Sequence, residues 1–502
     1  MHRRWAARAS FAKLAALGLA TGTVASVMSV TAGALLFPRT AAADEPVAAS
    51  EPRMMSETAE ITSVVDAFDK DDPFDLNLTL GFEQSWKSSN IHRETSLNQA
   101  GLSSGGYVAA TQNVATYSRA TSKLDVGADI GIYRDLALIL RLPIILSDTQ
   151  NLGDLNGSSN VPQVLQDSTG HQLFGVPFKS PNRSGIDWFS VGIDWAIYNQ
   201  QREPTKPTWV VGIEGRFAVG TPLHACNAAA AIQCPNPSNP TQNRDPGISR
   251  GMDSVGAHTI FSRRFGYVEP YSGLWFLADF PQTNSDFGAT NSFQGSVLNH
   301  PPYLGTFSMG MEVIPWEHLE QFQRFVTDFR LSGIYHSAGR EYSELFDALG
   351  SSQAPTLRSA NPGDFAAQSG CNPSTTQCQS VADPNAQKVY FTGITDQAAY
   401  VSLGGKVSAT YQAGEYIKFT AGAGLTYDQS HLITSADACN PNFTGSALAA
   451  GSCHSASGTS NTTTITGIPN PNFRSSIDLP GNRFSSDDGL TVDLWVSGIV
   501  MF

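Results

Sequence analysis

The last thirteen residues of the chain alternate between apolar and mixed positions with a period of two. Such alternation is typical of a β-strand, because successive side chains of a strand point to opposite faces. One face suits a hydrophobic environment, whereas the other contains both polar and apolar groups. The apolar face holds Leu490, Val492, Leu494, Val496, Gly498, Val500 and Phe502, and the mixed face holds Thr491, Asp493, Trp495, Ser497, Ile499 and Met501.

The same alternation recurs in eleven earlier stretches, which are therefore also predicted to be strands. The stretch 252–262 is the weakest of them, because Asp253 and Thr259 fall on its apolar face. The clearest pair is 187–199 with 209–220, where the alternation is strict. The twelve predicted strands cover about 74–87, 122–133, 136–147, 187–199, 209–220, 252–262, 267–280, 304–315, 325–336, 398–411, 416–427 and 490–502.

Apart from Asp253, charged residues in the interior of these strands stay on the face opposite to the apolar one. A Lys or Arg on a lipid-facing position near the bilayer midplane costs roughly 2–4 kcal/mol, so this restriction is informative. We expect the charged face to line an enclosed lumen, with opposite charges on neighbouring strands, as for Glu312 and Arg330, Asp328 and Lys406, or Lys418 and Asp493. The lumen-lining candidates are Asp125, Asp129, Arg141, Asp194, Glu214, Arg216, Glu269, Asp279, Glu312, Asp328, Arg330, Lys406, Lys418 and Asp493.

The connections between the predicted strands alternate in length. A soluble β-sandwich, which the terminal strand alone would also allow, has no reason to separate long from short connections in this way. An even number of strands with long loops at one end is the arrangement of bacterial outer-membrane barrels. The long connections are near 88–121, 148–186, 221–251, 281–303, 337–397 and 428–489, and the short ones near 134–135, 200–208, 263–266, 316–324 and 412–415.

In its terminal aromatic strand, one-sided charges and alternating loops, the chain resembles Gram-negative outer-membrane β-barrel proteins. The resemblance implies an all-β fold, a closed antiparallel transmembrane β-barrel of about 12 strands over 73–502, with long extracellular loops and short periplasmic turns. It also implies a setting in outer-membrane lipid, and recognition of the strand ending at Phe502 by the barrel-assembly machinery. It does not reach a family of known substrate.

The N-terminal region has the pattern of a secretory signal peptide. Arg3, Arg4, Arg8 and Lys13 precede an apolar segment, and Ala41-Ala42-Ala43 forms an A-x-A cleavage motif before Asp44. A retained membrane helix is the alternative. No later apolar run approaches the ~20 residues that a spanning helix needs. We therefore expect cleavage after residue 43, a periplasmic segment over 44–72, and export to the bacterial outer membrane.

Composition narrows the possible functions. Charged residues make up only 15 % of the chain, which also contains 45 glycines, and this favours strands with polar loops over a helical enzyme. Residues 1–43 contain five basic and no acidic residues, which leaves 26 basic and 44 acidic groups and a formal net charge of −18. An acidic protein of this kind is not expected to bind nucleic acid.

The six cysteines fall into three pairs, each inside one predicted long loop. Export to an oxidising compartment permits disulfides, and local pairing is the simplest choice among the 15 pairings that six cysteines allow. The alternative is metal binding, suggested by His224 near Cys226 and by His454 next to Cys453, but the spacing lacks C-x-x-C. We predict no metal and no cofactor. The expected pairs are Cys226 with Cys234, Cys371 with Cys378, and Cys439 with Cys453.

Three functions fit a twelve-stranded barrel. The first is a porin-like channel for passive or weakly selective passage of small solutes. The second is a non-conducting barrel, with paired charges in a filled interior, that is structural or binds ligands and other surfaces through its extracellular loops. Twelve strands fall between packed eight-stranded barrels and open porins of sixteen or more, so strand number does not decide. Within the loops, 341–349 could form a short amphipathic helix at the mouth.

The third possibility is a lipid-active enzyme, because outer-membrane phospholipases are also 12-stranded barrels. That family carries His-x-Ser on a strand, which puts both side chains on one face. Here His336 is followed directly by Ser337, and Ala338 occupies the position where the nucleophile would lie. His258 is better explained as a hydrogen-bonding group of the lumen, and Gly422 and Gly424 as strand positions that make room in the wall. We therefore predict that the protein is not an enzyme.

Overall fold

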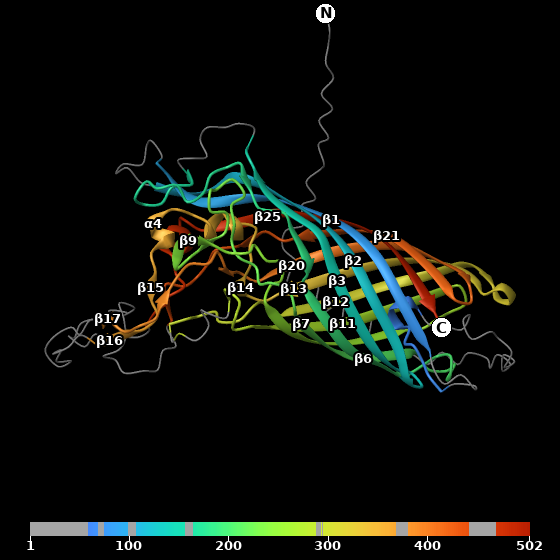
Figure 1. Cartoon of the computed structure of the whole chain (residues 1–502). Coiled ribbons are helices and arrows are strands. Elements are labelled where there is room, and N and C mark those ends of the chain that lie inside the picture. Colours follow the sequence, from blue (N-terminus) through green and yellow to red (C-terminus); the bar gives the residue numbers. More distant parts are fainter. Residues whose placement is uncertain are drawn as a thin grey trace, which may run out of the picture. The chain divides into compact units, whose positions relative to one another are not determined.

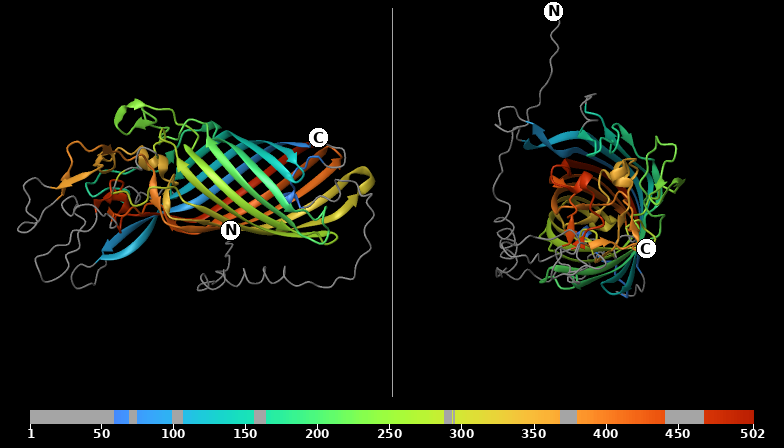
Figure 2. Two further views of the ribbon diagram at one scale, coloured as in Figure 1. Left: turned by 90° about the horizontal axis from the view of Figure 1, so that it is seen from below. Right: turned by 90° about the vertical axis from the view of Figure 1, so that its left-hand side faces the viewer.

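The chain forms one continuous ring of antiparallel strands in a computed structural model that describes residues 59–68, 75–98, 107–155, 164–287, 293, 295–367, 380–440 and 468–502. All of these residues belong to one unit, Pro52–Phe502. Figures 1 and 2 show this ring, and its long strands number twelve. They are β1 (Leu76–Asn98), β2 (Tyr107–Tyr133), β3 (Leu136–Gly153), β6 (Trp188–Tyr198), β7 (Thr208–Ala218), β10 (Met252–Ser262), β11 (Val268–Pro281), β12 (Leu304–His318), β13 (Gln323–His336), β20 (Tyr400–Gly414), β21 (Ile417–Asp428) and β25 (Phe484–Met501).

The ring closes between β1 and β25, so that its first and last strands are neighbours. Their pairing runs from Asn77 opposite Met501 to Arg93 opposite Phe484, and Leu76 and Phe502 exchange both backbone hydrogen bonds. Closure leaves no free sheet edge in the wall, as a barrel in lipid requires. The predicted closed antiparallel barrel of about 12 strands is confirmed.

Short turns lie at one end of the barrel and long connections at the other, and we call these the turn end and the loop end. The turns cover 134–135, 199–207, 263–267, 319–322 and 415–416, with the 3-10 segment η4 (Leu319–Gln321) in one of them. The long connections cover 154–187, 219–251, 282–303, 337–399 and 429–483.

The predicted loop 88–121 is wrong, because most of it is strand. β1 and β2 continue pairing as far as Asn98 opposite Tyr107, with one bulge at Ile91 and His92. This ribbon extends beyond the part of the barrel with an apolar exterior, so it does not need an apolar face toward lipid. Its sequence therefore lacks the alternation used to find strands. Its inner side instead packs against loops: Ile91, Val114 and Tyr117 are buried.

The exterior of the barrel carries an apolar surface with aromatic side chains toward both ends. Apolar residues of the mid-wall are well exposed, among them Leu80, Ile213, Leu331, Leu403 and Val496. Two aromatic girdles flank an apolar band in membrane β-barrels. Exposed aromatic residues at the turn end are Tyr133, Tyr198, Tyr267, Trp316, Tyr411 and Tyr416, and those at the loop end are Phe217, Phe280, Tyr303, Tyr335 and Tyr427.

Polar positions on this exterior are hydrogen-bonded. Thr259 accepts a bond from the Trp209 indole N–H at 2.8 Å, and Asp253 accepts one from Ala218 N at 3.0 Å. These contacts explain how the weakest predicted strand tolerates both residues. Strict alternation along 187–199 would place Tyr198 on the same inner face as Asp194. Tyr198 instead lies outside against Trp209, because a bulge after Ala196 shifts the alternation. None of the helices in the described ranges is long and apolar enough to cross a membrane.

We expect Ile213→Arg to destabilise the barrel by about 2–4 kcal/mol, because the guanidinium would face hydrocarbon at mid-strand. Ile213 is 63 % exposed on the outer face of β7. The matched control is Ser497→Arg on the inner face, where the new cation would lie beside Asp125. Urea unfolding in lipid vesicles, followed by tryptophan fluorescence, measures both. Equal losses for the two variants would contradict the proposed orientation of the wall.

The long connections fold together at the loop end into a compact cap. Its apolar core includes Leu165, Phe174, Leu345, Leu349 and Ile477, all nearly inaccessible, and packs onto β1 and β2 through Ile91 and Val114. Seen from the loop end, orange and red segments lie across the opening of the ring (Figure 2). Short helices of the cap are α3 (Phe346–Gly350), α4 (Pro355–Arg358) and α5 (Ser475–Asp478). Its short strands are β4 (Phe178–Lys179), β5 (Arg183–Ile186), β8 (Pro235–Asn236), β9 (Asn239–Asn243), β14 (Gly339–Glu341), β15 (Asn361–Pro362), β16 (Phe365–Ala367), β17 (Ser380–Ala382), β18 (Lys388–Val389), β19 (Thr395–Gln397), β22 (His431–Leu432), β23 (Cys439–Asn440) and β24 (Ile468–Pro469).

Candidate functional site: a lumen closed at both ends

The structure places the fourteen predicted lumen residues on the inner face of the ring, opposite the exposed apolar side chains of the same strands. Most of them form ion pairs with other inner residues. The pairs are Lys123 with Asp125 at 3.4 Å, Arg141 with Asp129, His258 with Asp194 at 3.3 Å, Arg216 with Glu214 at 3.0 Å, Arg250 with Asp279 at 2.9 Å, Arg330 with Asp328 at 3.3 Å, and Lys418 with Glu60 at 3.0 Å. Glu269 accepts a hydrogen bond from Ser262, Glu312 from Glu60 N, and Asp493 from Ser85.

The expected cross-strand pairing of opposite charges does not occur on β12, β13 and β20. The register instead aligns like charges in two layers, with Glu269, Glu312 and Asp328 as direct partners in one row. One inner position nearer the loop end, Arg330 lies directly opposite Lys406. The lumen therefore has a layer of carboxylates toward the turn end and a layer of cations next to it.

A short N-terminal segment, residues 59–68, lies inside the ring near the turn end. Its 3-10 turn η2 (Glu60–Thr62) contacts strands on several sides of the ring. Glu60 binds Lys418 of β21 and donates its backbone N–H to Glu312 of β12 at 2.8 Å, while the hydroxyls of Thr62 and Ser262 lie 2.8 Å apart. Contacts with such separate strands require the segment to lie inside the ring.

The same segment leaves the lumen along the turn that joins β2 to β3. Ala67 and Arg134 exchange two backbone hydrogen bonds, and Arg202 contacts both Asp66 and Asp135. Sequence reasoning missed this role, because 59–68 has neither strand alternation nor a long helix. Its composition is mostly apolar, with Glu60 and Asp66 as its charged residues, and says nothing about its position. Most of the predicted periplasmic segment 44–72 lies outside the described residues.

Between the N-terminal segment and the wall lies a water-accessible cavity of about 310 Å³. Its lining is strongly polar and contains both charges, with Trp495 as its largest apolar surface. Several of the charged side chains are partly exposed within the lumen, so they are hydrated rather than packed. The lining residues are Glu60, Glu83, Glu312, Arg324, Val326, Asp328, Arg330, Lys406, Ser408, Thr410, Thr420 and Trp495.

Buried ion pairs hold the cap together and tie it to the wall at the loop end. Arg183 makes a two-pronged contact with Asp347, at 2.9 and 2.7 Å, with both side chains almost fully buried. Lys87 of β1 lies 3.0 Å from both Glu344 of the cap and Asp428 of β21. Burial alone would raise the pKa of Glu344, but the Lys87 ammonium holds it at about 2. The carboxylate is therefore charged at neutral pH.

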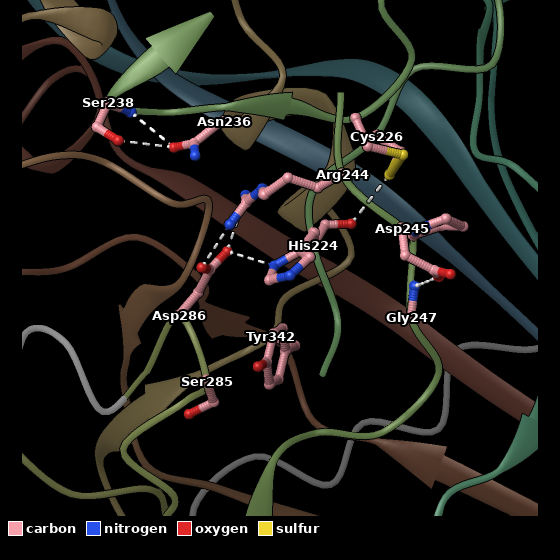
Figure 3. Close-up of polar contacts among 12 residues, drawn as sticks. His224, Cys226, Asn236, Ser238, Arg244, Asp245, Gly247, Ser285, Asp286 and Tyr342 are labelled. Carbon is pink, nitrogen blue, oxygen red and sulfur yellow. Dashed lines mark hydrogen bonds and ion pairs between the residues drawn. A yellow bond between two sulfur atoms is a disulfide. The ribbon is translucent and has the colours of Figure 1, made fainter. Parts of the chain in front are cut away.

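The connection 219–251 is fixed by a disulfide and by one aspartate of the next connection (Figure 3). Cys226 is bonded to Cys234, as predicted. Asp286 accepts from Arg244 at 2.7 Å and lies 3.0 Å from His224 Nδ1. Burial alone would raise the pKa of Asp286, but hydrogen bonding to His224 and Arg244 lowers it below its usual value.

These contacts argue against metal binding at His224 and Cys226, because the sulfur is in a disulfide and the imidazole contacts a carboxylate. No group of three metal-ligating side chains occurs within the ranges that the structure describes. Cys439 is also disulfide-bonded, and its partner lies outside the described residues. Cys371, Cys378 and Cys453 lie outside them as well, so their pairing stays a prediction.

His336 does not act on Ser337 in this geometry. The His336 ring stacks on Tyr400 at 4.2 Å, and its Nε2 lies 3.2 Å from the hydroxyl of Ser402. Ser402 already donates to Asp428 at 2.7 Å and is only 2 % exposed, so a substrate carbonyl cannot reach its oxygen. The arrangement lacks the accessible nucleophile that acyl transfer requires.

A ring that closes on itself, apolar outside and ionic inside, decides the structural class. The chain is a transmembrane β-barrel of the outer-membrane type. No family model matches it, and no curated protein matches it.

Among solved structures it is similar to an outer membrane channel from Pseudomonas putida, with 6 % identity, a TM-score of 0.29, and coverage of 85 % of this chain and 95 % of that one. It is also similar to a mutant of the monoaromatic hydrocarbon channel TodX, with 7 % identity, a TM-score of 0.31, and coverage of 89 % and 94 %. A third is a Pseudomonas aeruginosa FadL homologue, with 8 % identity, a TM-score of 0.30, and coverage of 85 % and 90 %.

Proposed function

We propose that the protein is a bacterial outer-membrane channel for small solutes, closed in this conformation by two elements that are not part of its wall. The observation that carries the proposal is the hydrated, charged cavity enclosed between residues 59–68 and the ring. In this proposal residues 1–43 are a cleaved signal peptide, the turn end faces the periplasm and the cap faces outward. The exterior contacts outer-membrane lipid, and the barrel-assembly machinery reads the strand ending at Phe502.

A purely structural barrel has no need of a hydrated interior. Here the side chains of Glu83, Asp125 and Arg330 are 30–40 % exposed although they face the lumen. An ion or polar solute loses part of its own hydration shell in the passage. The fixed charges and the water around them replace that hydration and so lower the energy of the solute there. A barrel that served stability alone would fill this space with packed side chains, as eight-stranded barrels do.

The closing segment at the turn end is held by a small number of polar contacts. Glu60 with Lys418, Glu60 N with Glu312, and Thr62 with Ser262 are the main ones. Each hydrogen bond contributes about 0.5–1.5 kcal/mol net, or about 1.5–3 kcal/mol when one partner is charged. When the segment withdraws, water can form hydrogen bonds with the polar groups that it leaves behind. Opening therefore does not require the wall to unfold.

A reversible tether tests the role of the segment. In the double variant Thr62→Cys, Ser262→Cys a disulfide would fix the segment to β10, since the two native hydroxyls are 2.8 Å apart. We expect channel events in planar bilayers for the wild type, their loss in the oxidised double variant, and their return on reduction. Wild type with and without the same reductant controls for the native disulfides.

A variant lacking residues 44–68 completes the design, because it should conduct without closing at the turn end. If neither the wild type nor this deletion variant gave channel events, and both were shown to be folded, the result would reject a channel and favour a non-conducting barrel. Unchanged conductance of the oxidised tethered variant would reject gating by the segment and leave the channel itself standing.

A further inference from the structure

Within the part of the chain that the structure describes, Lys406 of the inner wall has no carboxylate at ion-pair distance. Seven lumen lysines and arginines lie within 3.3 Å of a carboxylate, namely Lys87, Lys123, Arg141, Arg216, Arg250, Arg330 and Lys418. Among the described residues no carboxylate lies within 4.0 Å of Lys406 Nζ. Its side chain is exposed to the cavity, and its Nζ lies 5.4 Å from the centre of the Trp495 ring. The Asp493 carboxylate lies in the same cross-strand row, on the other side of Gly424 and beyond ion-pair distance.

A second cation is held beside it by the sheet register. Arg330 is the direct cross-strand partner of Lys406, and both side chains line the cavity. Like charges in directly opposite positions of a sheet are destabilising unless something compensates them. Asp328 compensates Arg330 at 3.3 Å, and Tyr271 accepts from Arg330 Nε at 3.0 Å. Lys406 has no such protein partner in the described chain, which leaves room for an external anion.

Two glycines shape the wall around this position. The Trp495 ring lies on Gly422, where an added Cβ would come within 2.2 Å of the indole, and the Lys406 side chain lies on Gly424. Gly422 and Gly424 are the direct partners of Trp495 and Asp493 on β25. Without a side chain at these positions, the aromatic face and the ammonium group lie next to each other at the cavity surface.

The remaining charges restrict the ligand. Glu60, Glu83, Glu312 and Asp328 also line the cavity, so a dianion such as phosphate would be repelled from several sides. A single carboxylate between Lys406 and Arg330 meets two cations at the shortest range, and an aromatic ring attached to it can stack on the indole. A volume of about 310 Å³ is at the small end of ligand sites, which suits a one-ring molecule.

We propose that the lumen cavity is a subsite for small aromatic monocarboxylates, with the carboxylate between Lys406 and Arg330 and the ring against Trp495. The inference rests on the proposed channel function, since it names the class of solute that this lumen retains. Passage then includes a bound stage, in which the acid replaces water around Lys406.

Fluorine NMR with 4-fluorobenzoate as the probe tests the subsite on the purified full chain in detergent. We expect saturable line broadening for the wild type, at least tenfold weaker binding for Lys406→Gln, and unchanged binding for Arg216→Gln. The control removes the same charge from a lumen cation that does not line the cavity and already pairs with Glu214. 4-Fluorobenzylamine and fluoroacetate separate the contributions of the charge and the ring.

Binding is also measured in the variant lacking residues 44–68, in case the closing segment excludes the probe. Equal binding by Lys406→Gln and wild type, equal binding of the amine and the acid, or no binding in either background would overturn the subsite. Fluorobenzoate binding without bilayer conductance would keep the subsite and reject the channel. Conductance without fluorobenzoate binding would keep the channel and reject the subsite.

Discussion

Asp347→Ala should loosen the cap at the loop end of the barrel, with a loss of cap stability of about 3–5 kcal/mol. Removing one member of a buried ion pair leaves the other charge uncompensated in a low-dielectric environment. Arg183 is that remaining charge, and its side chain is 1 % exposed. The aspartate also accepts from Cys226 N at 2.9 Å, while Arg183 donates to His224 O, so the substitution disconnects three connections at once.

Hydrogen exchange of the cap in detergent-solubilised protein measures this effect. We expect faster exchange over 165–185 and 343–358 with little change in the barrel strands, because the wall does not depend on the pair. Bilayer recordings of the same variant should show more open time than the wild type, if the cap closes the lumen. Both readings follow from a local opening rather than from global unfolding.

Two further variants separate the buried charge from general damage. Arg183→Met with Asp347→Leu replaces the pair by apolar side chains and should recover most of the lost protection. Glu203→Ala removes an exposed pair with Lys206 at the turn end and should leave stability nearly unchanged. If the cap were as well protected from hydrogen exchange in Asp347→Ala as in Glu203→Ala, the buried pair would not be what holds the cap in place.

Lys87→Met should reverse the sign of the pH dependence of cap stability. In the wild type the Lys87 ammonium holds the pKa of Glu344 at about 2, against an ordinary value near 4.5. A carboxyl group whose pKa is lowered by folding stabilises the folded state fully above about pH 4.5, and this stabilisation is lost as the pH falls toward 2. The wild-type cap should therefore weaken in acid.

Without Lys87, burial becomes the dominant influence on Glu344 and raises its pKa above the ordinary value. The variant cap should then be more stable at pH 4 than at pH 8, and weaker than the wild type at pH 7 by about 3 kcal/mol. The pH dependence of cap stability is measured as the exchange protection of 340–350, corrected for the intrinsic pH dependence of exchange. Parallel pH profiles of wild type and variant would show that Lys87 does not govern this carboxyl group.

The wall of the barrel could be predicted from the sequence because lipid imposes a strict rule on it. Apolar side chains must point outward and charges inward, so the alternation gives both the strands and their faces. The rule fails where a bulge shifts the alternation, as before Tyr198, and where a strand leaves the membrane, as in the outer part of β1 and β2. There the pairing follows from tertiary contacts that leave no periodic trace.

The candidate site was only partly predictable for the same reason. Alternation places Lys406 and Arg330 in the lumen, but their direct opposition depends on register, which the turns and bulges set. The cap and the segment 59–68 are irregular, and contacts between residues far apart in sequence determine their positions. Examples are Arg183 with Asp347, and Glu60 with Lys418. No local pattern marks such pairs.

The two charge layers of the inner wall have a directional consequence. Glu269, Glu312 and Asp328 form the layer toward the turn end, and Arg330 and Lys406 the adjacent one. In the channel proposed above, an anion arriving from the loop end would meet the cation layer before the carboxylate layer. One arriving from the turn end would pass Arg324 and Lys418 and then meet the carboxylate layer first. The two ends of the lumen thus differ in their fixed charge, which is the asymmetry that a rectifying pore requires.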